Sequence, residues 1–430
     1  MERITIEPSG ALQGTLRVPG DKSISHRALM LSALAPEHTE IYGLLMGEDV
    51  LATRAAMIAL GAGISEPEDG YCVVDGVGLY GLLAPLEHLD MGNSGTAMRL
   101  LAGILAGQRF EATLFGDESL TRRPMRRVID PLTAMGASIT GDDGRPPLVV
   151  RPAGDGLRGI NYTPPVASAQ VKSCVVLAGL YAKGTTRVTE TLPTRDHTER
   201  MLAAFGAPLE VDGETVIVRG GGQIHTPGRI DVPGDISSAA FWLVAASVIP
   251  GSDLRLEGVG MNPRRTGILG LLERMGGAIT ITNEREVCGE PVADLRVRHA
   301  RLRGIDIGAA DVPAAIDEFP VLFVAAALAE GTTVLSGAEE LRAKESDRIA
   351  VMAKGLAAMG ANLEERPDGI RIEGGSLRQA AVDAAEDHRC AMALLIAGAA
   401  AAGAEVHDTE NIRTSYPDFL AHAKAVGLRP

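Results

Sequence analysis

Helical hydrophobic patterns in this chain end repeatedly at the same short phrase, a hydrophobic residue followed by glycine and usually alanine. In RIAVMAKGLAAMG at 348–360, the apolar positions before the glycine have the spacing of one helix face. Glycine suits the left-handed residue that ends many helices before a strand. The phrase predicts six units of about 70 residues. Its glycines are Gly61, Gly136, Gly206, Gly276, Gly360 and Gly427.

A second series of segments predicts one buried helix in each unit. Each segment opens with polar or charged residues and then becomes apolar on most sides. The segments are DKSISHRALML from 21, GNSGTAMRLLAGIL from 92, ASAQVKSCVVLAGL from 167, GDISSAAFWLVAA from 234, IDEFPVLFVAAAL from 316 and DHRCAMALLIAGA from 387. Short alternating runs such as RITIEP, TVIVRG and GIRIEG predict strands. Each unit is therefore expected to interleave strands with two helices.

A longer repeat covers half the chain, because VPGDKSIS begins at Val18 and VPGDISSA at Val232. With 430 residues the chain is also too long for a single hydrophobic core. We predict one domain of residues 20–232 and a second of residues 1–19 plus 233–430, with chain crossings near 19–21 and 232–235. Alternatively, VPGD is only a strand end and a turn that caps a helix. That interpretation describes the backbone and leaves function open.

Composition narrows the class of protein. Hydrophobic residues make up 46% of the chain, which predicts a globular protein with a large core. Aromatic residues are only 3%, and the formal charge of −14 repels nucleic acid, so no nucleic-acid partner is expected. The N-terminus lacks a secretory pattern and no apolar run is long enough to span a bilayer, which predicts a cytoplasmic protein with no membrane partner. The four cysteines are far apart, so neither a zinc site nor a disulfide framework is expected.

The polar helix starts indicate anion binding. A helix N-terminus offers unpaired N–H groups and the positive end of the helix dipole to phosphate or carboxylate. Basic residues lie on or beside these starts: Lys22, Arg27, Arg99, Arg123, Lys172, Arg195, Lys344, Arg348 and Arg389. Ordinary helix caps and a solvated basic face would explain any single start. Six such starts together favour a cleft for small phosphorylated anions.

One phosphate-binding pattern is misleading. GVGLYG at 76–81 fits the dinucleotide fingerprint, but LLAPLEHLD follows it in place of a long apolar helix. The sequence contains no GK[ST], HExxH or GxSxG motif. We therefore expect neither a nucleotide cofactor nor a catalytic metal.

Nine motifs in order resemble the 5-enolpyruvylshikimate-3-phosphate synthase family over nearly the whole chain. They are PGDKSISHR, GNSGTAMRLL, RRPM, ASAQVKS, TRDHTERML, PGDISSAA, IDEFP, LRAKESDRI and DHRCAM. The resemblance implies an α/β fold with two similar domains, each of three βαβαββ repeats, an inside-out α/β barrel whose helix N-termini face the interdomain cleft. It also implies transfer of the enolpyruvyl group of phosphoenolpyruvate to the 5-hydroxyl of shikimate-3-phosphate, with release of phosphate and no cofactor or metal, by a monomer that glyphosate inhibits.

The resemblance also implies roles for individual residues. The shikimate-3-phosphate site would comprise Lys22, Ser23, Arg27, Ser168, Gln170, Arg195, Asp317 and Lys344. The phosphoenolpyruvate site would comprise Lys22, Gly95, Arg123, Gln170, Arg348 and Arg389. Asp317 is the candidate base for the hydroxyl, because a carboxylate must take its proton. Either Glu345 or Lys22 would move the proton of the methylene carbon, and the sequence leaves that choice open.

Structural explanations compete with these roles. Asp317 and Glu318 could cap the helix that follows them, and Lys344, Glu345 and Arg348 have the spacing of a surface ion-pair cluster. Some positions also depart from the family pattern. Ala169 replaces a second serine, Cys390 replaces a methionine as a small core residue, and Thr414 stands where some members have lysine, with Arg413 beside it.

The sequence has two alternative functions. UDP-N-acetylglucosamine enolpyruvyl transferase shares the fold and donor, but it expects a GAKNA-like first motif and a reactive cysteine. Here the first motif is GDKSISHR, and GDESLTRRPM has no cysteine. A catalytically inactive anion-binding relative would have lost its carboxylates, whereas Asp317 and Glu345 are present.

Overall fold

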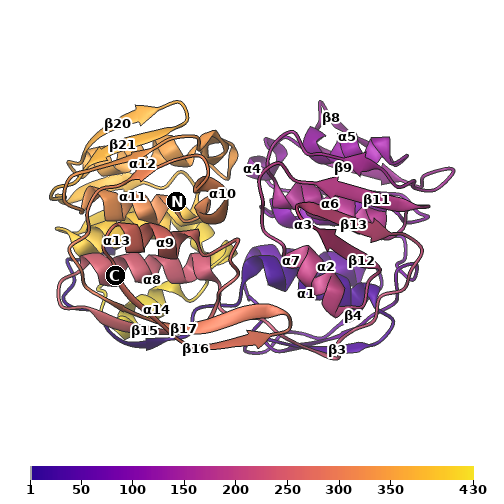
Figure 1. The fold of residues 1–430 in the computed structure, drawn as a ribbon, viewed down its shortest axis with the longest axis horizontal. Helices are drawn as coiled ribbons and strands as arrows, with labels where there is room; N and C mark the ends of the chain where they lie inside the picture. Colours follow the sequence, from indigo (N-terminus) through magenta and orange to yellow (C-terminus); the bar gives the residue numbers. More distant parts are fainter. Residues whose placement is uncertain (1) are drawn as a thin grey trace. The chain divides into compact units, whose positions relative to one another are not determined.

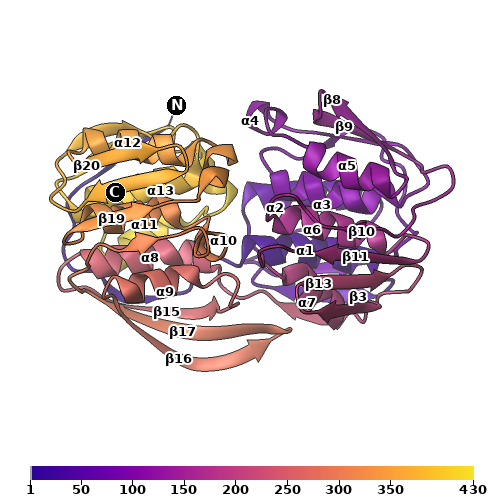
Figure 2. The ribbon, with the colours of Figure 1, turned by 45° about the horizontal axis from the view of Figure 1, so that its top comes forward.

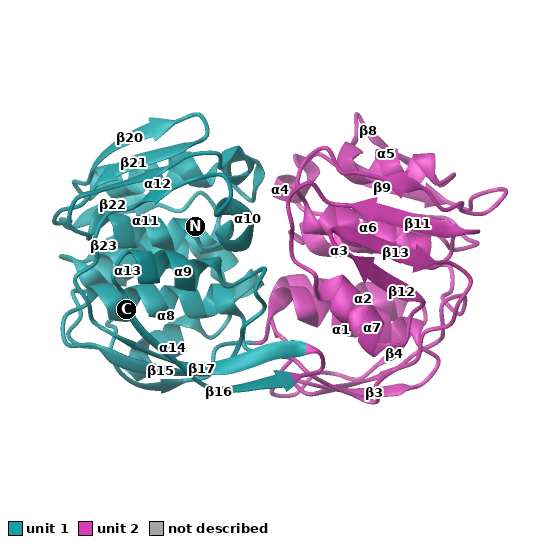
Figure 3. Ribbon diagram, in the orientation of Figure 1, with its two compact units in different colours: residues 1–19, 233–286, 290–430 teal, residues 20–232, 287–289 magenta. Residues whose placement is uncertain are grey.

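The structure is a computed structural model that describes residues 2–430 (Figure 1). The chain forms two compact units (Figure 3). Unit 1 comprises residues 1–19, 233–286 and 290–430, and unit 2 comprises residues 20–232 and 287–289. Each unit has its own hydrophobic core. The core of unit 1 includes Trp242 and Phe319, and that of unit 2 includes Leu101 and Phe205.

Unit 2 contains three four-stranded sheets. Their strands, in spatial order, are β14 (Arg229–Asp231), β3 (His38–Tyr42), β5 (Cys72–Asp75) and β4 (Gly63–Ile64); β6 (Leu89–Asp90), β7 (Ala112–Phe115), β9 (Arg145–Arg151) and β8 (Ser138–Asp142); and β10 (Asn161–Tyr162), β11 (Thr185–Thr189), β13 (Thr215–Arg219) and β12 (Leu209–Asp212). In each sheet the first two strands are parallel and the remaining pairs antiparallel. This shared order identifies three copies of one motif.

The helices of unit 2 alternate between buried and partly exposed. The buried ones are α1 (Lys22–Leu34), α3 (Gly95–Ala106) and α6 (Ala169–Gly179). The partly exposed ones are α2 (Glu48–Ala59), α5 (Arg126–Ala134) and α7 (His197–Ala204), and a short extra helix, α4 (Glu118–Thr121), precedes α5. Because α1, α3 and α6 are apolar on most sides, they fill the core.

Unit 1 repeats this plan. Its sheets are, in spatial order, β16 (Ala278–Val287), β17 (Glu290–Arg298), β15 (Asp253–Gly260) and β2 (Gln13–Leu16); β18 (Asp306–Ile307), β19 (Thr332–Leu335), β21 (Gly369–Glu373) and β20 (Asn362–Arg366); and β1 (Arg3–Ile6), β23 (Ala404–His407) and β22 (Ala380–Asp383). The buried helices α8 (Ile236–Val248), α11 (Phe319–Ala327) and α13 (His388–Ala400) lie side by side (Figure 2). The remaining helical elements are α9 (Gly267–Arg274), α10 (Val312–Ala315), η1 (Glu339–Ala343), α12 (Arg348–Ala358), η2 (Glu410–Thr414) and α14 (Phe419–Val426).

The predicted repeat is confirmed. All six phrase glycines adopt φ between 65° and 103°, and each follows α2, α5, α7, α9, α12 or α14. Such backbone is strained for other residues, which explains why glycine recurs there. The sixth repeat differs from the prediction, because its sheet has three strands and takes β1 from the start of the chain. Within residues 2–430, no helix is long and apolar enough to cross a membrane.

Candidate active site

The start of α1 places two basic side chains with different surroundings. The Asp21 side chain caps the helix by accepting from the Ile24 N–H over 2.9 Å. Lys22 forms an ion pair with Asp49, and the side chains are 14% and 6% exposed. The turn-and-cap interpretation of VPGD is therefore correct for the backbone, and the cap leaves Lys22 at the first position of the helix.

Arg27, one turn into α1, is buried and reaches two other helices. Its Nη1 donates to the Ser23 carbonyl at 2.8 Å, its Nη2 to Ser173 Oγ at 2.8 Å and its Nε to Thr198 Oγ1 at 2.7 Å. Ser173 belongs to α6 and Thr198 to α7. These hydroxyl partners were not predicted, because no sequence pattern relates positions so far apart in the chain.

Two guanidinium groups converge on the start of α3. Ser94 caps this helix, and a Cβ built on Gly95 would lie 3.1 Å from Nη1 of both Arg99 and Arg123. Arg123 also donates from Nη2 to Asn93 Oδ1 over 2.7 Å. The absence of a side chain on Gly95 thus leaves room beside two cations at a helix N-terminus, an arrangement suited to an anion.

The start of α6 is joined to α3 through Gln170. Its Oε1 accepts a short hydrogen bond from Arg99 Nη1, and its Nε2 donates to Thr96 Oγ1 over 2.9 Å. Ser168 is the N-cap, with its Oγ 3.4 Å from the Val171 nitrogen. Arg195 lies in the irregular segment between β11 and α7, where its side chain is half-buried. Helix α6 therefore contacts the start of α3 through Gln170 and contacts Arg27 of α1 through Ser173.

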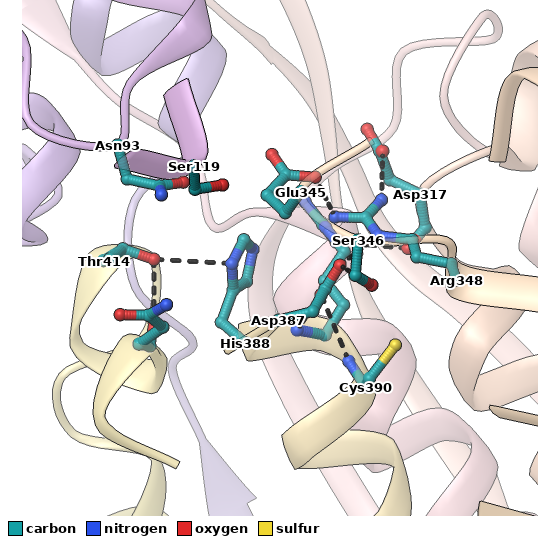
Figure 4. Close-up of polar contacts among 12 residues, drawn as sticks. Asn93, Ser119, Asp317, Glu345, Ser346, Arg348, Asp387, His388, Cys390 and Thr414 are labelled. Atoms are coloured by element: carbon teal, nitrogen blue, oxygen red, sulfur yellow. Dashed lines mark hydrogen bonds and ion pairs between the residues drawn. The ribbon is translucent and has the colours of Figure 1, made fainter. Parts of the chain in front are cut away.

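In unit 1, Arg348 is surrounded by three carboxylates (Figure 4). Its Nε donates to Asp387 Oδ2 at 2.9 Å, its Nη1 to Asp317 Oδ1 at 3.0 Å and its Nη2 to Glu345 Oε2 at 2.5 Å. Burial lowers the pKa of Arg348, but Asp387, Glu345 and Asp317 outweigh burial and raise this pKa well above its usual value. The guanidinium is therefore charged at any working pH.

Asp387 connects Arg348 to the start of α13. One oxygen accepts from the backbone N–H of Arg389 at 2.9 Å and caps that helix, while the other accepts from Arg348 and from Ser346 Oγ. Arg389 Nη1 donates to the Asp317 carbonyl at 3.3 Å. Our assignments from the sequence omitted Asp387. Its signal was available, since an aspartate also precedes α1 and α8 as their cap.

Lys344 lies just before this cluster, after η1. Burial lowers the pKa of Lys344, and the nearby Asp317, Glu340 and Glu345 oppose that effect while Arg348 adds to it. A half-buried lysine near carboxylates can donate hydrogen bonds to a polar substrate group.

The structural alternatives for this cluster are wrong. Neither Asp317 nor Glu318 caps α11 with its side chain: Asp317 contacts Arg348, and Glu318 accepts a short hydrogen bond from Ser237 Oγ. The Glu345–Arg348 ion pair does have the expected spacing, but the Arg348 side chain is 1% exposed, so the cluster is not a solvated surface feature.

Two of the departures from the family pattern, Cys390 and Thr414, are now placed. Cys390 is buried, and desolvation with the Asp387 charge raises its pKa well above its usual value, as expected of a core residue. Arg413 is exposed and donates from Nη2 to Glu2 Oε2 over 3.0 Å, while Thr414 is buried. The GVGLYG segment contains no helix or strand, which agrees with rejecting a dinucleotide site.

Comparisons with known proteins agree with this geometry. Residues 6–422 match the family EPSP synthase (3-phosphoshikimate 1-carboxyvinyltransferase). The chain is 59% identical to 3-phosphoshikimate 1-carboxyvinyltransferase of Alkalilimnicola ehrlichii, with 98% of this chain and 95% of that protein covered. It is 58% identical to the enzyme of that name from Acidithiobacillus ferrooxidans, with 100% and 98% covered.

Solved structures give the same result. EPSP synthase from Acinetobacter baumannii has a TM-score of 0.89 and 47% identity, covering 100% of this chain and 99% of that one. The enolpyruvyl transferase NikO from Streptomyces tendae, at 18% identity and a TM-score of 0.80, covers 100% and 98% and shares the fold. The matches extend over nearly the full length of the chain, so it belongs to the EPSP synthase family.

Proposed function

We propose that this chain transfers the enolpyruvyl group of phosphoenolpyruvate to the 5-hydroxyl of shikimate-3-phosphate and releases phosphate. The observation that carries the proposal is the Arg348 cluster, in which one buried guanidinium joins both candidate catalytic carboxylates, Asp317 and Glu345. Family membership supplies the substrates. The reaction belongs to the shikimate pathway.

The residues of unit 2 suit a sugar phosphate. Arg27 and Arg195 supply positive charge, while Ser23, Ser168 and Gln170 supply hydrogen bonds to hydroxyl and phosphate oxygens. From unit 1, Asp317 and Lys344 would contact the reacting hydroxyl. The proposed shikimate-3-phosphate site therefore consists of Lys22, Ser23, Arg27, Ser168, Gln170, Arg195, Asp317 and Lys344.

Phosphoenolpyruvate requires several cations, because it carries both a phosphate and a carboxylate. We assign it to Arg348 and Arg389 in unit 1 and to Lys22, Gly95, Arg123 and Gln170 in unit 2. The room beside Gly95 and the fixed guanidinium of Arg348 support this assignment. Fixed cations also stabilise the negative charge of a tetrahedral intermediate without reorganising during the reaction.

The side chains account for each proton. Asp317 takes the proton of the 5-hydroxyl as its oxygen bonds to C2 of phosphoenolpyruvate, and C3 gains a proton, which gives the tetrahedral intermediate. Loss of a proton from C3 and of phosphate from C2 then restores the double bond, and the proton that Asp317 took from the hydroxyl leaves with the released hydrogen phosphate. Glu345 or Lys22 moves the C3 proton.

UDP-N-acetylglucosamine enolpyruvyl transfer is the alternative, and the matching relatives do not favour it. Purified protein given phosphoenolpyruvate should release phosphate with shikimate-3-phosphate and not with UDP-N-acetylglucosamine. Phosphate release only with the second acceptor, or with neither, would refute the proposal.

We further propose that units 1 and 2 are the two domains of a cytoplasmic monomer. Each unit has a core of its own, which is the property that defines a domain. Light scattering should give a mass near 44.9 kDa. A mass of twice that value would show a dimer.

A further inference from the structure

Unit 2 contains a buried ion cluster that the proposed mechanism does not use. The Lys172 ammonium, in α6, lies 2.7 Å from Glu190 Oε2 and 2.7 Å from Glu199 Oε1. The side chains of Lys172, Glu190 and Glu199 are 1%, 4% and 6% exposed. Removing charges from water is costly even when they are paired, so such a cluster is poor evidence for stability alone.

The two glutamates bracket the segment that carries Arg195. Glu190 directly follows β11, and Glu199 lies in the first turn of α7. Residues 191–196 form neither helix nor strand, and residues 191–193 are exposed. Lys172 therefore binds both ends of a segment that has no regular structure of its own.

A buried threonine extends this attachment to the residue beside Arg195. Thr194 is 6% exposed, and its hydroxyl donates a short hydrogen bond to Glu190 Oε1. The other oxygen of the same carboxylate accepts from Lys172. The backbone at Arg195 is thus attached to α6 through two side chains and one ammonium.

A second contact between α6 and α7 lies next to the first. Ser173 is the residue after Lys172, and Thr198 is the residue before Glu199. Their hydroxyl oxygens are 2.6 Å apart. Arg27 donates to both hydroxyls, at 2.8 Å and 2.7 Å. The position of the Arg27 guanidinium therefore depends on how α7 sits against α6, which the Lys172–Glu199 ion pair fixes.

We propose that Lys172 is a positioning residue for shikimate-3-phosphate, which rests on the function proposed above. Its ammonium does not touch the substrate. It holds Glu190 and Glu199, and through them it holds Arg195 and Arg27 in the arrangement that receives the phosphate. Binding groups that are held in place before the ligand arrives bind more tightly than groups that must be ordered on binding.

The first test is Lys172→Met, which keeps the length of the side chain and removes its charge. Calorimetric titration of shikimate-3-phosphate without phosphoenolpyruvate should show a Kd about tenfold higher than that of the wild type. The KM for phosphoenolpyruvate should stay within about twofold, because that site keeps its own contacts. A Lys172→Met protein that binds shikimate-3-phosphate as the wild type does would overturn the proposal.

Val176→Ala is the matched control for stability. Val176 is fully buried one turn further along α6, and its side chain has no polar group. This variant should lower the Tm and leave the Kd unchanged. A Kd for shikimate-3-phosphate that rises in the same proportion to the loss of Tm in both variants would show that Lys172 has only a structural role. The proposal would then be wrong.

Two further variants separate charge burial from positioning. Lys172→Met/Glu199→Gln removes one of the carboxylates that the single variant leaves without its cation, so the Tm should recover while the Kd stays high. Lys172→Arg keeps a cation and should bind within about threefold of the wild type. Recovery of both the Tm and the Kd in the double variant would contradict the proposal. The double variant also provides the test if Lys172→Met alone does not fold.

The two proposals fail in different ways. If the wild type neither binds shikimate-3-phosphate nor releases phosphate, the function is wrong and the positioning role falls with it. If the wild type binds and turns over but Lys172→Met has the same Kd, only the positioning role is wrong.

Discussion

Asp317 accepts a hydrogen bond from Nη1 of Arg348 over 3.0 Å, so the proposed base is paired with a proposed ligand of phosphoenolpyruvate. Arg348 keeps its orientation through Nε, which is bound to the fully buried Asp387. Under the proposed roles, an anion that binds Nη1 or Nη2 competes with Asp317 or Glu345 for the same guanidinium. Binding of the donor would therefore release the carboxylates at the place where proton transfer is needed.

Replacing Asp317 should remove catalysis and leave the fold intact. Without a general base in hydrogen-bonding reach of the hydroxyl, kcat of Asp317→Ala should fall by about 10²–10⁴-fold. Arg348 retains Glu345 and Asp387, so little change in Tm is expected. Glu364→Ala, at an exposed position in β20 of the same unit, is the control and should keep wild-type kcat. Wild-type turnover by Asp317→Ala would show that the base is assigned wrongly.

Gly95→Ala should weaken binding of phosphoenolpyruvate. The added Cβ would lie 3.1 Å from Nη1 of Arg99 and of Arg123, so both guanidinium groups must move by a few tenths of an ångström. We expect the KM for phosphoenolpyruvate to rise about tenfold, equivalent to about 1.4 kcal/mol. Gly154→Ala, where a Cβ meets nothing within 4 Å, should leave this KM unchanged. An unchanged KM in Gly95→Ala would exclude Gly95 from the donor site.

The resemblance to the family also predicts inhibition by glyphosate. Glyphosate carries a phosphonate and a carboxylate, so it should bind the same cations as phosphoenolpyruvate and compete with it. Initial rates should be measured at several concentrations of glyphosate and phosphoenolpyruvate. The apparent KM for phosphoenolpyruvate should rise with the glyphosate concentration, and the maximum rate should not change. Gly95→Ala should be less sensitive. Inhibition that does not respond to phosphoenolpyruvate concentration would count against a shared site.

Local patterns predicted the repeats because their causes are local. A glycine is required where the chain turns left-handed after a helix, as Gly136 does with φ of 95°, and that need is visible in the sequence. Buried helices such as α8 are likewise visible as continuous apolar runs. The short helix α4 was not predicted, since four residues contain too little periodicity to recognise.

Side-chain partners were harder to predict because packing chooses them. Arg348 and Asp387 are 39 residues apart, and Lys172 and Glu190 are 18 apart. The sequence located the cations at helix starts, but it could not tell which carboxylate each would meet. For the same reason the partner of the predicted strand RITIEP was missed, since β1 pairs with β23 from the opposite end of the chain.

Tyr416→Phe should destabilise unit 1. The Tyr416 hydroxyl accepts from Trp242 Nε1 at 2.8 Å and lies 2.8 Å from His422 Nδ1, and Trp242 and Tyr416 are fully buried. Losing the hydroxyl leaves the indole N–H buried without this partner, which should cost about 1–3 kcal/mol of unfolding free energy. Trp242 is the only tryptophan, so its fluorescence during urea denaturation reports the change. A loss no larger than that of Tyr80→Phe, at an exposed tyrosine, would contradict the prediction.

His26 should make the protein less stable in mild acid. Burial, together with the charges of Lys22 and Arg27, lowers the pKa of His26 well below 6.5. Below about pH 6.5 the unfolded chain binds a proton at His26 that the folded chain excludes. The contribution of neutral His26 to stability is therefore fully present above about pH 6.5. As the pH falls below this value, the free energy of unfolding decreases by up to about 1.4 kcal/mol for each pH unit.

The matched variant is His26→Asn. Its amide can still contact Thr53 Oγ1, the 2.7 Å partner of His26 Nδ1, but it does not titrate. The variant should be less stable than the wild type at pH 7.5, because asparagine is smaller than histidine and leaves a cavity. Urea denaturation at pH 7.5, 6.5 and 5.5 should show that the free energy of unfolding falls less with pH in the variant than in the wild type. Parallel losses in the two proteins would mean that His26 does not cause the acid sensitivity.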